Sequence, residues 1–181
     1  RPLVLETLIR LVSLGVPDTP AQAGTSVSNP PLTRVLDPEV ARILERHLDP
    51  NIDRSLAVCA VMGNFLPQLA WLDTEWAHAH LDAIFPAPTT EEATRRFKAA
   101  FGTFVTTNGY ILSLAPVLSA AYRSAVGLVR DANAWDQQHL DPAARLVKHV
   151  IWMHLLTDEL PSGGLGEELI DALCGSVNPT I

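Results

Sequence analysis

The chain has little cysteine and no long uninterrupted apolar run, and each scarcity excludes a class of protein. Only two cysteines, Cys59 and Cys174, occur among 181 residues, which excludes a disulfide framework and indicates free buried thiols in a reducing compartment. The longest apolar run, Leu56 to Leu72, is interrupted by Pro67 and two amide side chains. It falls short of the ~20 apolar residues that span a bilayer. Because no signal peptide opens the chain either, we expect a cytoplasmic protein without a membrane span.

Positive charge is also scarce. Lys and Arg number 13 against 20 Asp and Glu, and the formal net charge is −7. This balance disfavours the phosphate-neutralising surface that nucleic-acid binding requires. The one basic cluster, Arg95-Arg96-Lys98, follows Glu91-Glu92 in an expected helix. We interpret it as a solvated helix face whose charges pair about one turn apart, and we predict no nucleic-acid partner.

Signatures of catalysis are missing as well. The sequence contains no GxSxG or HExxH motif, and the segment 163–166, Gly-Gly-Leu-Gly, lacks the Lys and Ser/Thr of a phosphate-binding loop. An all-helical, metal-dependent phosphohydrolase usually carries a His-Asp dipeptide, which this chain lacks. We therefore expect no catalytic site and no cofactor.

Six histidines leave a metal-dependent hydrolase as an alternative. The candidate ligands fall in two expected helices and are His78, His80 and Asp82 in one and His149, His154 and Asp158 in the other. Side chains two residues apart on a helix point ~200° apart, and those five apart ~140° apart. Neither histidine pair can therefore share a metal ion without outside help. The pairs His78–Asp82 and His154–Asp158 do face together, which favours hydrogen-bonded surface pairs.

Helix signals are what the chain has in abundance. Apolar residues at three- and four-residue spacing predict helices over about 3–14, 38–47, 52–72, 74–85, 90–107, 110–129, 142–157 and 165–174. Asp37, Asp73 and Asp141 stand at helix starts, and Thr89 with Glu92 forms a capping box. We expect a bend or end near Pro67 and a break at Pro116. The segment 16–36 is rich in Pro, Ser, Thr and Gly and is expected to be a flexible loop.

No segment alternates apolar and polar residues in the manner of a strand, so the predicted class is all-α. About eight helices, recurring as antiparallel pairs every ~30–40 residues, favour an α-solenoid-like stack of the HEAT or TPR kind over a four-helix bundle. The prediction is one helical domain over 1–181.

The four tryptophans are candidate contact residues because aromatic side chains serve both cores and interfaces. Trp71 and Trp76 flank the turn between the helices expected over 52–72 and 74–85, and we expect them to hold these two helices together. Trp135 lies in a polar stretch between helices and is the best candidate for an exposed contact, with a local cap as the alternative. A third hypothesis is a small-molecule sensor whose pocket is lined by Trp71, Trp76 and Phe97.

Several segments carry a resemblance to a known kind of protein. They are Leu5–Arg10, Ser55–Val58, Phe65–Leu69, Trp71–Asp73, Glu75–Ala77, Leu81–Pro86, Arg145–Val150, Leu155-Leu156 and Glu159-Leu160. Their order resembles the helical region near the C-terminus of large bacterial multidomain proteins, in which a sirtuin-like NAD hydrolase or a signal-transduction NTPase occupies the N-terminal part. The resemblance implies a role in antiphage or stress defence, with this segment as sensor or scaffold and the catalytic domain elsewhere.

The chain starts at Arg1 and ends without a terminal motif, and we expect both ends to be cuts within a longer protein. Capped amphipathic helices without a chemical constellation favour a non-catalytic helical repeat module. Its expected partner is another protein, a second copy of itself or the remainder of the parent chain.

Overall fold

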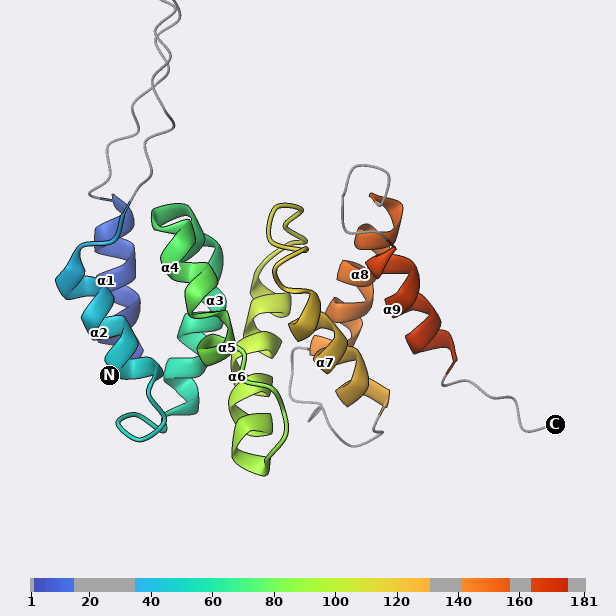
Figure 1. Ribbon diagram of the computed structural model, residues 1–181, viewed down its shortest axis with the longest axis horizontal. Coiled ribbons are helices and arrows are strands. Elements are labelled where there is room, and N and C mark those ends of the chain that lie inside the picture. The colour runs from blue at the N-terminus through green and yellow to red at the C-terminus, as the bar shows by residue number, and fades with distance from the viewer. Residues whose placement is uncertain (1, 15–34, 131–140, 157–163, 176–181) are drawn as a thin grey trace, which may run out of the picture.

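The computed structural model describes residues 2–14, 35–130, 141–156 and 164–175 (Figure 1). These residues form helices and no strand, which confirms the all-α prediction. The described helices are α1 (Pro2–Leu14), α2 (Pro38–Leu48), α3 (Leu56–Leu72), α4 (Thr74–Ala79), α5 (Leu81–Ile84), α6 (Glu91–Thr107), α7 (Ser119–Arg130), α8 (Pro142–Leu155) and α9 (Leu165–Cys174). Among them, none is both long and apolar enough to cross a membrane.

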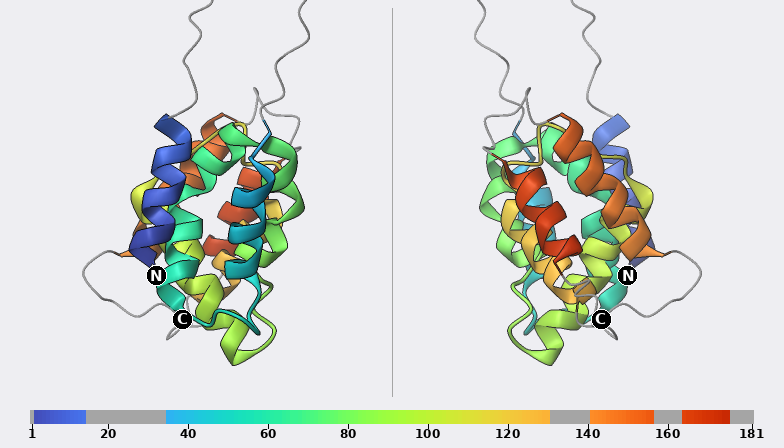
Figure 2. Two further views of the ribbon diagram at one scale, coloured as in Figure 1. Left: turned by 90° about the vertical axis from the view of Figure 1, so that its left-hand side faces the viewer. Right: turned by 90° about the vertical axis from the view of Figure 1, so that its right-hand side faces the viewer.

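The helices stand side by side along the long axis of the molecule. α1 and α2 lie at one end, and α8 and α9 lie at the other (Figure 1). Viewed along that axis, α1, α3 and α8 form one layer, and α2, α4 and α9 form the other (Figure 2). α1 packs on α3, α3 on α6 and α6 on α8, while α7 packs on α9. The regular repeat of a HEAT- or TPR-like solenoid stays a prediction, because α4 and α5 are short pieces where the other positions hold one helix.

Side-chain caps explain where four of the nine described helices begin. The Asp37 side chain accepts hydrogen bonds from two backbone N–H groups of α2, and Asp141 accepts one in the first turn of α8. Asp73 caps α4, and its other oxygen accepts from the Leu36 N–H at 3.0 Å. For α6 the cap is Thr90, one residue later than the predicted Thr89. These bonds satisfy N–H groups that have no partner within the helix.

Three predicted helices differ in their limits. The helix expected over 74–85 is broken at His80 into α4 and α5, which makes nine described helices where eight were expected. The helix expected over 110–129 begins only at Ser119, and turns occupy 112–118 around Pro116. α3 starts at Leu56, later than expected, and continues through Pro67 to Leu72. Proline has no backbone N–H, and its ring crowds the carbonyl four residues earlier, here that of Gly63. The carbonyl of the next residue, Asn64, accepts a hydrogen bond from the Asn108 side-chain amide at 3.1 Å.

The centre of the core is the contact between α3 and α6, the most extensive pair among the described helices. Gly63 of α3 lies so close to Ala100 of α6 that a Cβ atom at residue 63 would be 2.0 Å from the Ala100 carbonyl oxygen. Beside this crossing, four phenylalanine rings pack together, Phe85, Phe97, Phe101 and Phe104, with centroid separations of 5.2–6.4 Å. Such ring pairs add to the stability that burial already supplies.

The predicted loop over 16–36 lies outside the described residues except for its last two. Val35 is exposed, but Leu36 is buried, and its backbone is held by the Asp73 carboxylate. The chain is therefore ordered before the α2 cap, one residue earlier than the sequence indicated.

Candidate functional site

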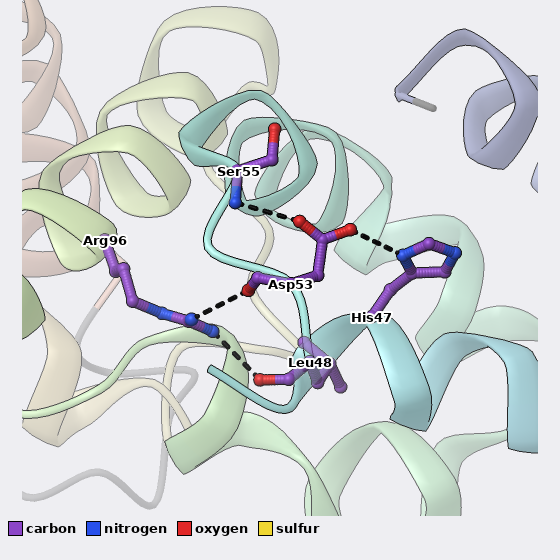
Figure 3. A network of polar contacts seen from close by, with 5 residues as sticks. All are labelled: His47, Leu48, Asp53, Ser55 and Arg96. Atoms are coloured by element: carbon purple, nitrogen blue, oxygen red, sulfur yellow. Dashed lines mark hydrogen bonds and ion pairs between the residues drawn. The ribbon is translucent and has the colours of Figure 1, made fainter. Parts of the chain in front are cut away.

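A network of buried polar groups holds the connection between α2 and α3 (Figure 3). Asp53 is buried, and one of its oxygens accepts from the Ser55 N–H at 2.9 Å. The other lies 2.8 Å from Nδ1 of His47, so this nitrogen carries a hydrogen. The preceding turn presents the carboxylate, because the Ile52 and Asp53 N–H groups both bond to the Asp49 carbonyl.

Arg96 reaches this connection from α6 and is itself buried. Its guanidinium donates to the Leu48 carbonyl at 2.9 Å and to the Asp53 carbonyl at 3.3 Å (Figure 3). The interpretation of Arg95-Arg96-Lys98 as one solvated face was therefore wrong for Arg96. Arg95 is exposed and pairs with Glu92 at 2.8 Å, as expected for that face. Arg96 is kept in the interior because it satisfies backbone carbonyls that no helix pairs.

A pocket of about 340 Å³ opens beside this network and is lined by Ile43, Arg46, His47, Ile52 and Asp53. Its volume is at the low end of the range for small-molecule sites. Both carboxylate oxygens of Asp53 already accept hydrogen bonds from the protein itself. This favours a structural role for the network, which joins the α2–α3 connection to α6. None of the lining residues is one of the aromatic residues proposed for the sensor pocket.

His149 forms a second buried polar group, between α6, α7 and α8. Its Nε2 lies 3.1 Å from the Asn108 carbonyl, and because a carbonyl only accepts, this nitrogen carries the hydrogen. Nδ1 then accepts from the Tyr122 hydroxyl at 2.9 Å. Burial lowers the pKa of His149 and raises the pKa of Tyr122. The pair is therefore a neutral histidine and a neutral tyrosine joined inside the core.

The remaining candidate metal ligands do not meet. His154 is exposed while His149 is buried, and Asp158 lies outside the described residues. In the other helix, His78 and Asp82 are exposed. His80 stacks on the Trp76 ring at 4.3 Å and donates from Nδ1 to the Trp76 carbonyl at 2.8 Å. Within the part of the chain that the structure describes, no three His, Cys, Asp or Glu side chains could hold a metal ion together.

The tryptophans are separated by the fold. Trp76 is buried and donates from Nε1 to Glu45 of α2 at 3.2 Å, so it joins α4 to α2. Trp71 is 45% exposed, and its expected part in holding α3 and α4 together stays a prediction. Phe97 is fully buried among the phenylalanines of α6. Trp135 lies outside the described residues.

The surface of α8 departs from an ordinary polar helix surface. Leu146, Val150 and Met153 are buried, while the opposite side of the helix is exposed and apolar. We call this side the α8 apolar face, and it consists of Val147, Ile151, Trp152 and Leu155. Trp152 is 54% exposed and Leu155 63%. Val147, Ile151 and Leu155 are four residues apart in succession, which places them in one stripe along the helix.

No known protein family, no curated protein and no solved structure matches this chain.

The candidate site therefore rests on the geometry of this molecule. The two buried polar groups around Asp53 and His149 have contacts that serve the fold. The α8 apolar face points away from the core and contributes nothing to it, so its exposure has no explanation in the fold. The sequence did not predict the stripe, because the spacing of apolar residues alone does not show which side of α8 is covered.

Proposed function

We propose that this chain is a non-catalytic helical module that binds protein through the α8 apolar face. The observation that carries the proposal is the exposed stripe of Val147, Ile151 and Leu155 beside the exposed Trp152. Contiguous exposed apolar groups with a polar surround are typical of interaction sites, and tryptophan is enriched among the residues that dominate binding energy. Arg145, Lys148 and His154 are exposed on the same helix and supply the polar surround.

The arrangement of the helices supports a scaffold in the same sense. A row of paired helices offers an extended surface, and in solenoid proteins such rows hold partners along a face or at an end. We propose a solenoid-like stack of this kind, in the cytoplasm, as part of a larger bacterial protein with a role in defence. The resemblance of the segments quoted above to helical regions of such proteins supports the bacterial origin and the role in defence.

The experiment that tests the proposal is site-specific photocrosslinking in the cells that produce the protein. A photoreactive phenylalanine derivative replaces Trp152. A matched control places the same group at Val117, an exposed apolar residue outside α8. The proposal predicts protein adducts at position 152 well above the yield at position 117. Equal yields at the two positions would refute it, whatever the identity of the captured proteins.

A further inference from the structure

The two ends of the helix row both expose apolar side chains. At the end opposite the α8 apolar face, α1 buries Leu5 and Ile9 against the core and exposes Leu3, Val4 and Leu11. We call these three exposed residues the α1 apolar face. Leu3, Val4 and Leu11 are 72%, 71% and 61% exposed. The outermost helices of a solenoid usually carry a polar outer face, because no further repeat covers them. Here the outer helix of the same layer is apolar at both ends (Figure 2).

The outer helices of the other layer carry charge of opposite sign. On α2, Arg42 and Arg46 are exposed and lie one turn apart, on the side opposite the buried Leu44 and Leu48. Glu39 pairs with Arg42 at 3.7 Å. The edge of α2 formed by Glu39, Arg42 and Arg46 therefore carries net positive charge.

On α9, Glu167 and Asp171 are exposed and also one turn apart, opposite the buried Leu165 and Leu169. Glu168 takes no part in this edge, because it binds Arg123 of α7 at 2.7 and 2.8 Å. The α9 edge therefore carries net negative charge. The helix row thus ends in an apolar helix beside a basic one at the α1–α2 end, and in an apolar helix beside an acidic one at the α8–α9 end.

We propose that the occupant of the α8 apolar face is the α1 apolar face of a second copy of this chain, with the acidic α9 edge against the basic α2 edge. This proposal rests on the proposed function and names its partner. Because α1 and α8 share one layer and α2 and α9 the other (Figure 2), a copy placed end to end continues both layers. Apolar side chains then meet apolar ones, and opposite charges meet.

The rival arrangement is a two-fold dimer in which one α8 apolar face meets another. It would bring Lys148 toward Lys148, because this exposed residue borders the stripe, and it would place two acidic α9 edges near each other. Like charges across an interface oppose association. A head-to-tail contact uses two different surfaces and leaves one of each open at the ends, so it builds chains that grow with concentration.

The test uses two variants that each remove one surface. Ile151→Asp places a charge in the α8 apolar face, and Val4→Asp places one in the α1 apolar face. Both residues are exposed, so the fold should be unchanged, which circular dichroism checks. Sedimentation velocity should show a mass that rises with concentration for the wild-type chain and a monomer for each variant alone.

The mixture of the two variants decides between the arrangements. Each retains the surface that the other lacks, so a head-to-tail contact predicts a species of twice the monomer mass and nothing larger. A two-fold contact through α8 predicts that Val4→Asp still dimerises and that mixing adds nothing. If position 152 crosslinks to other proteins while the mixture stays monomeric, the interaction function survives and the self-stacking proposal fails.

Charge reversal tests the second pair of surfaces. Arg42→Glu with Arg46→Glu should weaken association on the order of tenfold, and so should Glu167→Arg with Asp171→Arg. An equimolar mixture of the two doubly substituted chains should recover most of the affinity, because each basic edge again meets an acidic one. The control is Arg95→Glu, which changes an exposed residue on α6 in the middle of the row and should leave association unchanged. Recovery that fails in the mixture would overturn the proposed pairing of α2 with α9.

Discussion

Gly63→Ala should destabilise the protein although alanine favours helix. The new methyl carbon would lie 2.0 Å from the oxygen, 2.6 Å from the carbonyl carbon and 2.9 Å from the Cα of Ala100. All three are backbone atoms, so no side-chain rotation relieves the contact. α3 and α6 would have to separate by roughly 1.5 Å, because ordinary van der Waals contacts begin at ~3.5 Å.

Two effects of opposite sign decide the magnitude. Replacing glycine in a helix interior gains about 1 kcal/mol. Overpacking a close contact costs about 1–3 kcal/mol and occasionally more, and this one separates the most extensive helix pair, around the buried Phe97 and Phe101. We expect a net loss of about 2 kcal/mol in the free energy of unfolding. For a chain of this length that lowers the midpoint of thermal unfolding by roughly 4–8 °C.

Gly127→Ala is the matched control. Gly127 lies in α7, and a Cβ atom there would meet nothing within 4 Å. It should therefore stabilise the protein by up to about 1 kcal/mol. The assay is urea unfolding followed by circular dichroism at equal protein concentration. Equal stability gains in the two variants would refute the close contact between α3 and α6.

Three further predictions concern the buried polar groups. Arg96→Met should lower the free energy of unfolding in urea by about 2–4 kcal/mol, because two buried carbonyls lose their donor. The control Arg95→Met changes an exposed residue and should alter that free energy by less than about 0.5 kcal/mol. Similar losses in the two variants would contradict the buried placement of Arg96. Tyr122→Phe should cost about 1–2 kcal/mol, and no loss would place its hydroxyl in water. Burial lowers the pKa of His149 in the folded chain, so its contribution to stability is complete above about pH 6.5, the unfolded value, and is lost as the pH falls below it. His149→Gln should therefore flatten the decline in unfolding free energy between about pH 7 and 5, and an unchanged pH profile would contradict a neutral buried histidine.

Local chemistry explains which parts of the fold were predictable. Asp37, Asp73 and Asp141 each cap a helix as expected, because a cap depends only on residues two or three positions away. The helix limits that were predicted wrongly depend on packing instead. No residue pattern in 74–85 indicates the break at His80. The His80 ring donates a hydrogen bond to the Trp76 carbonyl and stacks on the Trp76 ring.

Long-range contacts explain what the sequence could not show about the candidate site. Arg96 is in an arginine-rich helix segment that is typical of a solvated face, but the carbonyls that draw it inside belong to residues 48 and 53. The α8 apolar face has the same origin. The spacing of Leu146, Val150 and Met153 correctly indicates a buried side, yet only the position of α8 at the end of the row leaves Ile151 and Trp152 uncovered.

The most direct test of the account is the association state of three chains measured side by side. Sedimentation velocity over a hundredfold range of concentration should show the wild-type chain and the control Val117→Asp growing in mass together, while Ile151→Asp remains a monomer. That result would tie association to the α8 apolar face. Three chains that behave alike, whether all associate or all stay monomeric, would contradict the claim that this face binds a second copy.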